Sequence, residues 1–271
     1  MNNSQTKLIN IALKVAKTSV KQAGEMLLAK RSDLKVEVHK DLVDFSTNLD
    51  IAAEKCIIDN LIANFPDHNI ISEEIGQLDK QSLYTWIIDP LDGTKEFQRG
   101  LSNFSVCLTL QTPTEILLSC VYIPATKELF FSGLGLGSWQ GKKQLVVSKE
   151  KNLSKAMIVF HAPDYKNPEA VKDRHWRVVT QLDKVDYRTF VRLNDNMILC
   201  DLAKGGYDGY IHLTTKTTGW WDVAPGILLA LEAGATVTDS LGHALTPNQL
   251  INGIVISNGL IHQQLLEIIN Q

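Results

Sequence analysis

Residues 86–94 read WIIDPLDGT, an apolar run that ends on an aspartate, a proline, a leucine and a second aspartate. The proline fixes its own φ and lacks an amide hydrogen, so it breaks the strand and stiffens the turn. Asp89 and Asp92 can then point to the same side, where their carboxylates repel each other unless a cation lies between them. Gly93 allows a ligand close to the backbone, and Thr94 suits the start of a helix, whose free amides favour a phosphate. The stretch therefore predicts a turn for a divalent cation and a phosphate; a plain strand end followed by a helix cap is the alternative.

Further carboxylates fall at the ends of predicted elements. Glu73 and Glu74 directly follow a predicted strand at residues 70–72. Asp222 follows two tryptophans at a predicted helix start, and Asp50 opens the second predicted helix. Taken singly, these residues also fit a solvated turn or a helix N-cap. Taken together, they supply oxygen donors without sulfur, which is the ligand set that Mg²⁺ prefers.

This donor set predicts phosphoryl chemistry. Two Mg²⁺ ions about 3.5–4 Å apart can activate a water and stabilise the leaving oxygen of an in-line displacement at phosphorus. Phosphatases of the haloacid dehalogenase class instead use D-x-D-G-T after an N-terminal strand, with the first aspartate as nucleophile. Here two residues separate Asp89 from Asp92, and the motif lies a third of the way along the chain. A metal-activated water is therefore favoured over a covalent aspartyl intermediate.

The composition narrows the class of protein. The chain has 271 residues, and its 27 basic and 30 acidic residues give a net charge of −3, a balance that disfavours a nucleic-acid polymer as partner. No run of about 18 apolar residues predicts a membrane span. Lys14, Lys17 and Lys21 interrupt the apolar stretch that a signal peptide would need. The four cysteines have no CxxC spacing and predict free thiols in a reducing compartment, so we expect a cytoplasmic protein.

Hydrophobic periodicity predicts helices alternating with strands. The first part of the chain indicates two helices, a strand that delivers Asp89 and an antiparallel meander. The pattern changes near residue 145, after which strands at 156–160 and 187–193 flank a polar, irregular segment at 161–175. This segment is interpreted as a surface loop, with a lid over the ligand as the alternative. The other predicted elements are helices at 194–204, 227–232 and 260–269 and strands at 210–213, 235–238 and 254–257.

Four motifs, in this order, are similar to those of the inositol monophosphatase superfamily of magnesium-dependent, lithium-sensitive phosphatases. They are DFSTNLD at 44–50, ISEE at 71–74, DPLDGT at 89–94 and WDVA at 221–224. The resemblance covers almost the whole chain. It implies a layered αβαβα fold of the α+β or α/β class. In that fold an N-terminal α+β half, residues 1–145, holds most metal ligands, and a C-terminal α/β half, residues 146–271, closes the active site.

The resemblance also implies a role for each motif residue, with two or three Mg²⁺ ions in the site. The implied metal ligands are Glu73, Asp89, the carbonyl of Leu91, Asp92 and Asp222. Asp50 and Thr94 would orient and deprotonate the attacking water, with Glu74 as a supporting acid. The implied substrate contacts are the amides of Gly93 and Thr94 for the phosphate, together with His212 and Asp222.

The subfamily depends on smaller differences. Inositol monophosphatases usually read DPIDGTTNF, whereas residues 89–97 read DPLDGTKEF, which is similar to the 3′(2′),5′-bisphosphate nucleotidases. His212 stands where inositol-specific members carry a glutamate, and a histidine suits a second phosphate; a solvent-facing strand residue is the alternative. The stretch Arg192–Met197, RLNDNM, departs from the nucleotidase pattern.

We therefore expect a phosphomonoesterase for a small phosphorylated metabolite, with 3′-phosphoadenosine 5′-phosphate, hydrolysed to AMP, as the first substrate. Inositol-1-phosphate is the second, and histidinol phosphate or a sugar phosphate are further candidates. An inactive relative that only binds a phosphorylated ligand is the alternative outside enzymes. A homodimer is left open.

Overall fold

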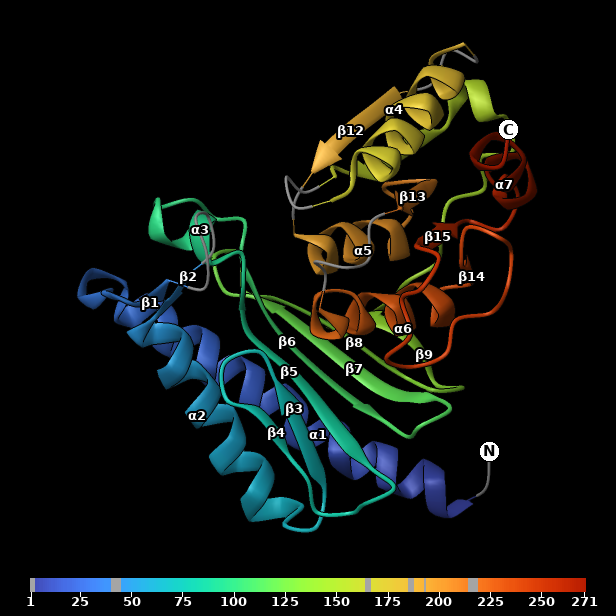
Figure 1. Cartoon of the computed structure of the whole chain (residues 1–271). Helices are drawn as coiled ribbons and strands as arrows, with labels where there is room; N and C mark the ends of the chain where they lie inside the picture. Colours follow the sequence, from blue (N-terminus) through green and yellow to red (C-terminus); the bar gives the residue numbers. More distant parts are fainter. Residues whose placement is uncertain (1–2, 40–44, 164–166, 185–187, 193, 214–218) are drawn as a thin grey trace.

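The computed structural model describes most of the chain (Figure 1). The described residues are 3–39, 45–163, 167–184, 188–192, 194–213 and 219–271. Four predictions therefore fall partly outside the described residues. These are the DFSTNLD motif at its first residue, Asp44; the polar segment at residues 164–166; the predicted strand 187–193 at both of its end residues; and the RLNDNM stretch at Leu193.

The described elements stack as five layers, in which three layers of helices alternate with two sheets (Figure 1). From one side to the other, the helix layers are α1 (Asn3–Ala29) with α2 (Asn48–Asn64), α5 (Asp195–Ala203) with α6 (Ala224–Glu232), and α4 (Glu169–Asp183) with α7 (His262–Ile269). The predicted αβαβα arrangement is confirmed. Because α5 and α6 lie between two sheets, most of their residues are buried, whereas α1 is buried along one stripe only.

The first sheet has eight strands in the order β10-β9-β8-β7-β6-β5-β3-β4. Only the pair β3 and β5 is parallel, and the predicted antiparallel meander is confirmed as β6, β7 and β8. The strands are β3 (Asn69–Ser72), β4 (Gly76–Leu78), β5 (Thr85–Asp92), β6 (Ser105–Gln111), β7 (Ile116–Ile123), β8 (Glu128–Gly133), β9 (Gly137–Gln140) and β10 (Lys143–Gln144). A separate short ribbon pairs β1 (Val36–His39) with β2 (Phe45–Thr47).

The second sheet has five strands in the order β12-β11-β13-β15-β14. Its strands β12, β11 and β13 are parallel, and β15 runs antiparallel to both of its neighbours. The strands are β11 (Met157–His161), β12 (Arg188–Arg192), β13 (Gly209–His212), β14 (Thr236–Thr238) and β15 (Ile254–Ser257). The remaining elements are α3 (Thr94–Gln98) and the 3₁₀ turns η1 (Arg31–Asp33), η2 (Leu153–Lys155) and η3 (Trp220–Asp222).

Buried apolar side chains form three clusters: one between α1, α2 and the first sheet, one that spans both faces of the α5 and α6 layer, and one between the second sheet, α4 and α7. The central cluster joins Ile87 and Cys107 of the first sheet to Val159 and Tyr210 of the second through α5 and α6. This shared core means that the division into halves at residues 1–145 and 146–271 stays a prediction. The four cysteines are free thiols, and no described helix is both long and apolar enough to cross a bilayer.

The polar segment at 161–175 is not irregular throughout, and that prediction is wrong from residue 169 onward. Helix α4 begins at Glu169 and covers the outer face of the second sheet. Only one stripe of this helix is buried, including His175, Val178 and Leu182, because its other faces meet solvent. The apolar residues of this helix do follow helical spacing, but polar residues outnumber them, and the interpretation as an irregular segment rested on that polar composition.

Candidate active site

Strand β5 places Asp89 and Asp92 at one end of the first sheet. The predicted break at the proline is wrong, because the strand continues to Asp92, which pairs with Ser105 on β6. The register shifts between the two aspartates, so the proline occupies an irregular step where a strand tolerates a missing amide hydrogen. Both aspartates are buried, at 1% and 9% exposure.

Gly93 makes the transition from β5 to α3. Its φ is +93°, and a Cβ there would lie 2.6 Å from the carbonyl oxygen of Asn103 and 2.8 Å from Nδ2 of Asn194. Both the backbone conformation and the close packing therefore require glycine. Helix α3 then begins at Thr94, as predicted.

Thr94 and Asp50 lie in contact. The Thr94 hydroxyl is 2.9 Å from Oδ1 of Asp50 and 3.0 Å from the carbonyl oxygen of Leu91. Asp50 lies in the first turn of α2, where its Oδ2 accepts a 2.9 Å hydrogen bond from the Thr47 amide and also bonds the Thr47 hydroxyl. Burial, together with the charge of Glu74, raises the pKa of Asp50. The structure thus brings the predicted catalytic pair together, while their roles stay a prediction.

Four predicted metal ligands form an acidic cluster, which we define as Glu73, Asp89, Asp92 and Asp222. They come from the turn after β3, from β5 and from η3. Burial first, and then the charges of Glu73, Asp92 and Asp222, raises the pKa of Asp89 well above its usual value. Burial, Glu73 and Asp92 likewise raise the pKa of Asp222. Each carboxylate feels its neighbours, so the members of the cluster lie close together.

The same causes act on Asp92. Burial and the charge of Asp195 raise its pKa to about 7. Each of these buried carboxylates disfavours the negative charge of its neighbours. A bound divalent cation would remove this repulsion, so the cluster is suited to such an ion. The donors are oxygen atoms only, which suits Mg²⁺. Asp222 is not the N-cap of α6, since that cap is Val223; its Oδ2 accepts a 2.6 Å hydrogen bond from the Gly219 amide.

Sequence reasoning missed Glu54, a second buried carboxylate on α2. Its side chain is fully buried, and one oxygen accepts hydrogen bonds from the turn that carries Glu73 and Glu74. A signal was present in the sequence. Glu54 lies four residues after Asp50 and three before Ile57, so it falls on the face of α2 that packs inward.

Sequence reasoning also missed Asp195, the first residue of α5, which lies between two histidines. We define the histidine cluster as His161, Asp195 and His212. Nδ1 of His161 lies 2.8 Å from Oδ1 of Asp195, and Nδ1 of His212 lies 3.6 Å from Oδ2. The two imidazole rings are stacked, with their centroids 3.7 Å apart.

His212 is fully buried, so the alternative that it faces solvent is wrong. Burial alone would raise the pKa of Asp195, yet the two neighbouring histidines hold it below its usual value. Asp195 raises the pKa of Asp92 in turn, so the histidine cluster adjoins the acidic cluster. One ligand atom from each member lies within 4.8 Å of the others. A single ion bound by both imidazoles would have to lie in the plane of each ring, and two stacked planes tilted by only 15° meet well beyond bonding distance of either ring.

The RLNDNM stretch that sequence comparison singled out lies at the start of α5. Asn194 has a φ of +78°, and its side-chain amide donates to the carbonyl of Asn103 beside the β5 turn. Asn196 is fully buried, donates to the carbonyl of Trp221 and accepts a 3.1 Å bond from the Gly226 amide. The stretch therefore links the chain beside the end of β5 to η3, which carries Asp222.

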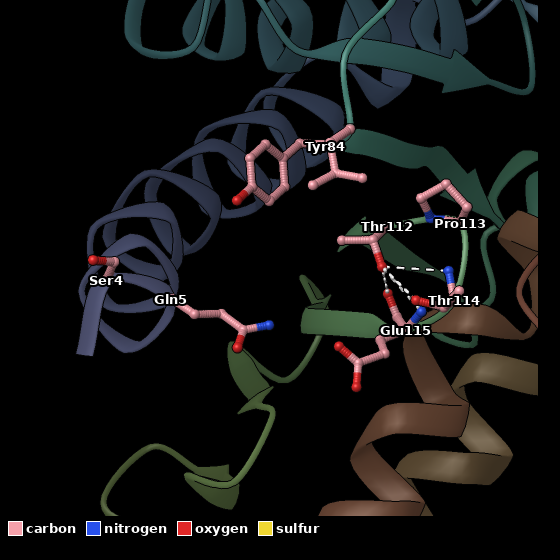
Figure 2. A pocket seen from close by; sticks show the side chains of 8 residues that line it. Ser4, Gln5, Tyr84, Thr112, Pro113, Thr114 and Glu115 are labelled. Atoms are coloured by element: carbon pink, nitrogen blue, oxygen red, sulfur yellow. Dashed lines mark hydrogen bonds between the residues drawn. The ribbon is translucent and has the colours of Figure 1, made fainter. Parts of the chain in front are cut away.

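A surface pocket of about 490 Å³ lies at the other end of β5, between the first turn of α1 and the turn after β6 (Figure 2). It is lined by hydroxyl, aromatic and proline side chains, and Thr112 accepts a 3.1 Å hydrogen bond from the Glu115 amide within it. Glu115 is its one charged lining residue. The pocket includes none of the predicted site residues.

Comparisons with known proteins agree with this geometry. Over 251 residues, the chain is 33% identical to the Nus factor SuhB of Pasteurella multocida, covering 90% of each chain. It is 30% identical over 268 residues to the inositol-1-monophosphatase of Caulobacter vibrioides, covering 96% of this chain and 98% of that protein. Among solved structures, extragenic suppressor protein suhB from Bartonella henselae superposes with a TM-score of 0.84 at 25% identity, covering 96% of this chain and 99% of that one. The model of the inositol monophosphatase family matches residues 10–271. With its fold and its relatives in agreement, the chain belongs to the inositol monophosphatase family.

Proposed function

We propose that the protein is a Mg²⁺-dependent phosphomonoesterase, in which the acidic cluster and the carbonyl of Leu91 hold two or three ions. The observation that carries this proposal is the group of buried carboxylates that raise one another's pKa, next to the bonded pair Asp50 and Thr94. When bound, the ions would supply positive charge to the phosphate oxygens and to the attacking water. Inhibition by lithium belongs to the same proposal.

Asp50 and Thr94 would act on the attacking water. The Thr94 hydroxyl donates toward Asp50 or Leu91, which leaves an oxygen lone pair to accept a hydrogen bond from a water. Asp50 would take the proton, and its raised pKa makes it a better base than an exposed aspartate. Glu74, whose charge contributes to that raised pKa, would support it.

For the substrate, we propose a phosphate monoester of a polyol, such as inositol-1-phosphate, ahead of a bisphosphate nucleotide. A second phosphate beside His212 would approach the carboxylate of Asp195, which already pairs with the two histidines. An uncharged hydroxyl can share hydrogen bonds with these groups without that repulsion. The relative from Caulobacter vibrioides is named for inositol-1-phosphate hydrolysis, which points the same way.

A role as a binding protein is the second candidate, because three of the relatives carry the name Nus factor SuhB. The bonded pair Asp50 and Thr94 favours the enzyme, since a binding protein does not need a water activated at this position. Release of phosphate that depends on Mg²⁺ separates the two candidates.

The test is phosphate release from inositol-1-phosphate and from 3′-phosphoadenosine 5′-phosphate, side by side, with Mg²⁺ and with a chelator. We expect Mg²⁺-dependent release, with a higher kcat/KM for the inositol phosphate. Preference for the nucleotide would leave the metal site in place and reverse the order of substrates. No release from either, by protein that binds Mg²⁺, would contradict the enzyme.

A further inference from the structure

We propose that Glu54 is a positioning residue that fixes the turn carrying Glu73 and Glu74 and thereby sets the affinity of the acidic cluster for Mg²⁺. This inference rests on the proposed function. Glu54 itself does not belong to the acidic cluster, and its contacts are to the chain that presents that cluster.

Three donors converge on one oxygen of the Glu54 side chain. The hydroxyl of Ser72, the last residue of β3, donates to Oε1. The backbone amides of Glu74 and Ile75 donate to the same atom over 3.1 and 3.2 Å. Glu73 lies between these donors, so Glu54 holds the backbone on both sides of a predicted metal ligand.

Burial makes the loss of these hydrogen bonds costly. The side chains of Glu54 and Ser72 are both fully buried, so the hydrogen bond between them is shielded from water, and the two amide bonds are partly buried. Loss of this shared acceptor would leave the buried hydroxyl of Ser72 and both amides without their partner, which favours the observed turn over others. Oε2 of Glu54 is also buried and has no partner within the described part of the chain. All of the contacts therefore run through Oε1.

Helix α2 links this turn to the catalytic pair. Asp50 and Glu54 are four residues apart and project from the same face of α2. Asp50 bonds Thr94 at the start of α3, and Glu54 bonds the turn after β3. One rigid helix therefore sets the position of the proposed water-activating pair relative to a proposed metal ligand.

The experiment measures Mg²⁺ binding by isothermal titration calorimetry for five forms of the full chain: the unchanged protein, three Glu54 variants and one control. Glu54→Ala removes the acceptor, and loss of a partner behind a metal ligand typically weakens metal binding by about 10–100-fold. Glu54→Gln keeps an oxygen at the Oε1 position and places its amide at the unpartnered Oε2, so we expect affinity close to that of the unchanged protein. Glu54→Asp keeps the charge and shortens the reach by one methylene, so we expect it to resemble Glu54→Ala.

Ile57→Val on the same helix is the matched control, because Ile57 is fully buried in apolar surroundings. We expect it to lower the thermal unfolding midpoint and to leave Mg²⁺ affinity unchanged. Wild-type affinity in folded Glu54→Ala would overturn the proposal. Weakened binding in Glu54→Gln with normal binding in Glu54→Asp would also overturn it, because charge and not reach would then matter.

The calorimetric readout separates this inference from the proposed function. If the unchanged protein binds Mg²⁺ but releases no phosphate, the enzyme proposal fails and the Glu54 series still gives its answer. If the unchanged protein binds no Mg²⁺, both proposals fail.

Discussion

The acidic cluster and the histidine cluster are neighbours in space, yet the chain encodes them differently. Asp89 and Asp92 lie at the end of one strand, β5, and the other members of the acidic cluster stand in short motifs of their own. The histidine cluster takes one residue each from β11, α5 and β13, and none of the three stands in a recognisable motif. The difference teaches that a short stretch of sequence can bring together one group of buried polar side chains, whereas the neighbouring group depends on residues that are far apart in the chain.

The largest expected effect tests the acidic cluster. Asp89→Asn should lower kcat on the order of 10³-fold, because this carboxylate would contact both metal ions and no other group replaces its charge. The metal-free variant should unfold at a higher temperature than the metal-free parent, since the change removes a buried charge that its neighbours repel. Phosphate release and thermal unfolding with a chelator measure the two effects. A variant that keeps more than a few per cent of activity would contradict the assignment of Asp89 to the metal site.

Thr94→Val tests the water-activating pair. The change removes the hydroxyl bonded to Asp50 and preserves the shape of the side chain, so we expect kcat to fall on the order of 10²-fold. KM should change little, because the phosphate is proposed to bind backbone amides. Steady-state kinetics provide the measurement, and a change in KM alone would assign Thr94 to substrate binding instead.

Asp195→Asn tests the histidine cluster and should act on selectivity more than on rate. Loss of the carboxylate charge leaves two histidines without their anion, so the ratio of kcat/KM for the bisphosphate nucleotide to that for inositol-1-phosphate should rise about tenfold. Asp201→Asn is the matched control, since Asp201 lies on the same helix in a 2.7 Å ion pair with Lys204. An unchanged ratio would separate the histidine cluster from substrate choice.

The smallest expected effect is on the pH dependence of stability, to which Asp92 and Asp195 contribute with opposite signs. The folded-state pKa of Asp92, about 7, lies above its ordinary 3.8, so its contribution to stability is present below about pH 4 and is lost as the pH rises toward 7. Asp195 has the opposite sign, because its pKa is lowered and its contribution is lost as the pH falls. Thermal unfolding of the metal-free protein between pH 4 and 7 should therefore show a decline that Asp92→Asn reduces. An equal decline in parent and variant would assign it to other groups.

The fold was predictable where each element showed its own pattern. The stripe of α1 predicted a helix with one buried face, and the short apolar runs of β6 and β7, bounded by turn signals, predicted strands, which the structure buries along their whole length. Helix α4 was missed because its polar faces dominate its sequence, and the continuation of β5 past its proline was missed because pairing with Ser105 overrides the local break.

The sequence alone determined the identity of the chemistry. Residues 89–94 combine two aspartates with a glycine and a threonine, and further acidic residues fall at the ends of other predicted elements. Together they form an oxygen donor set at the end of a predicted strand. Only the tertiary structure showed that Glu54 accepts hydrogen bonds from the turn beside Glu73 and that Asp195 lies between His161 and His212. The physical reason is that buried hydrogen bonds and charge pairs join residues through space, and their partners leave no periodic trace in the chain.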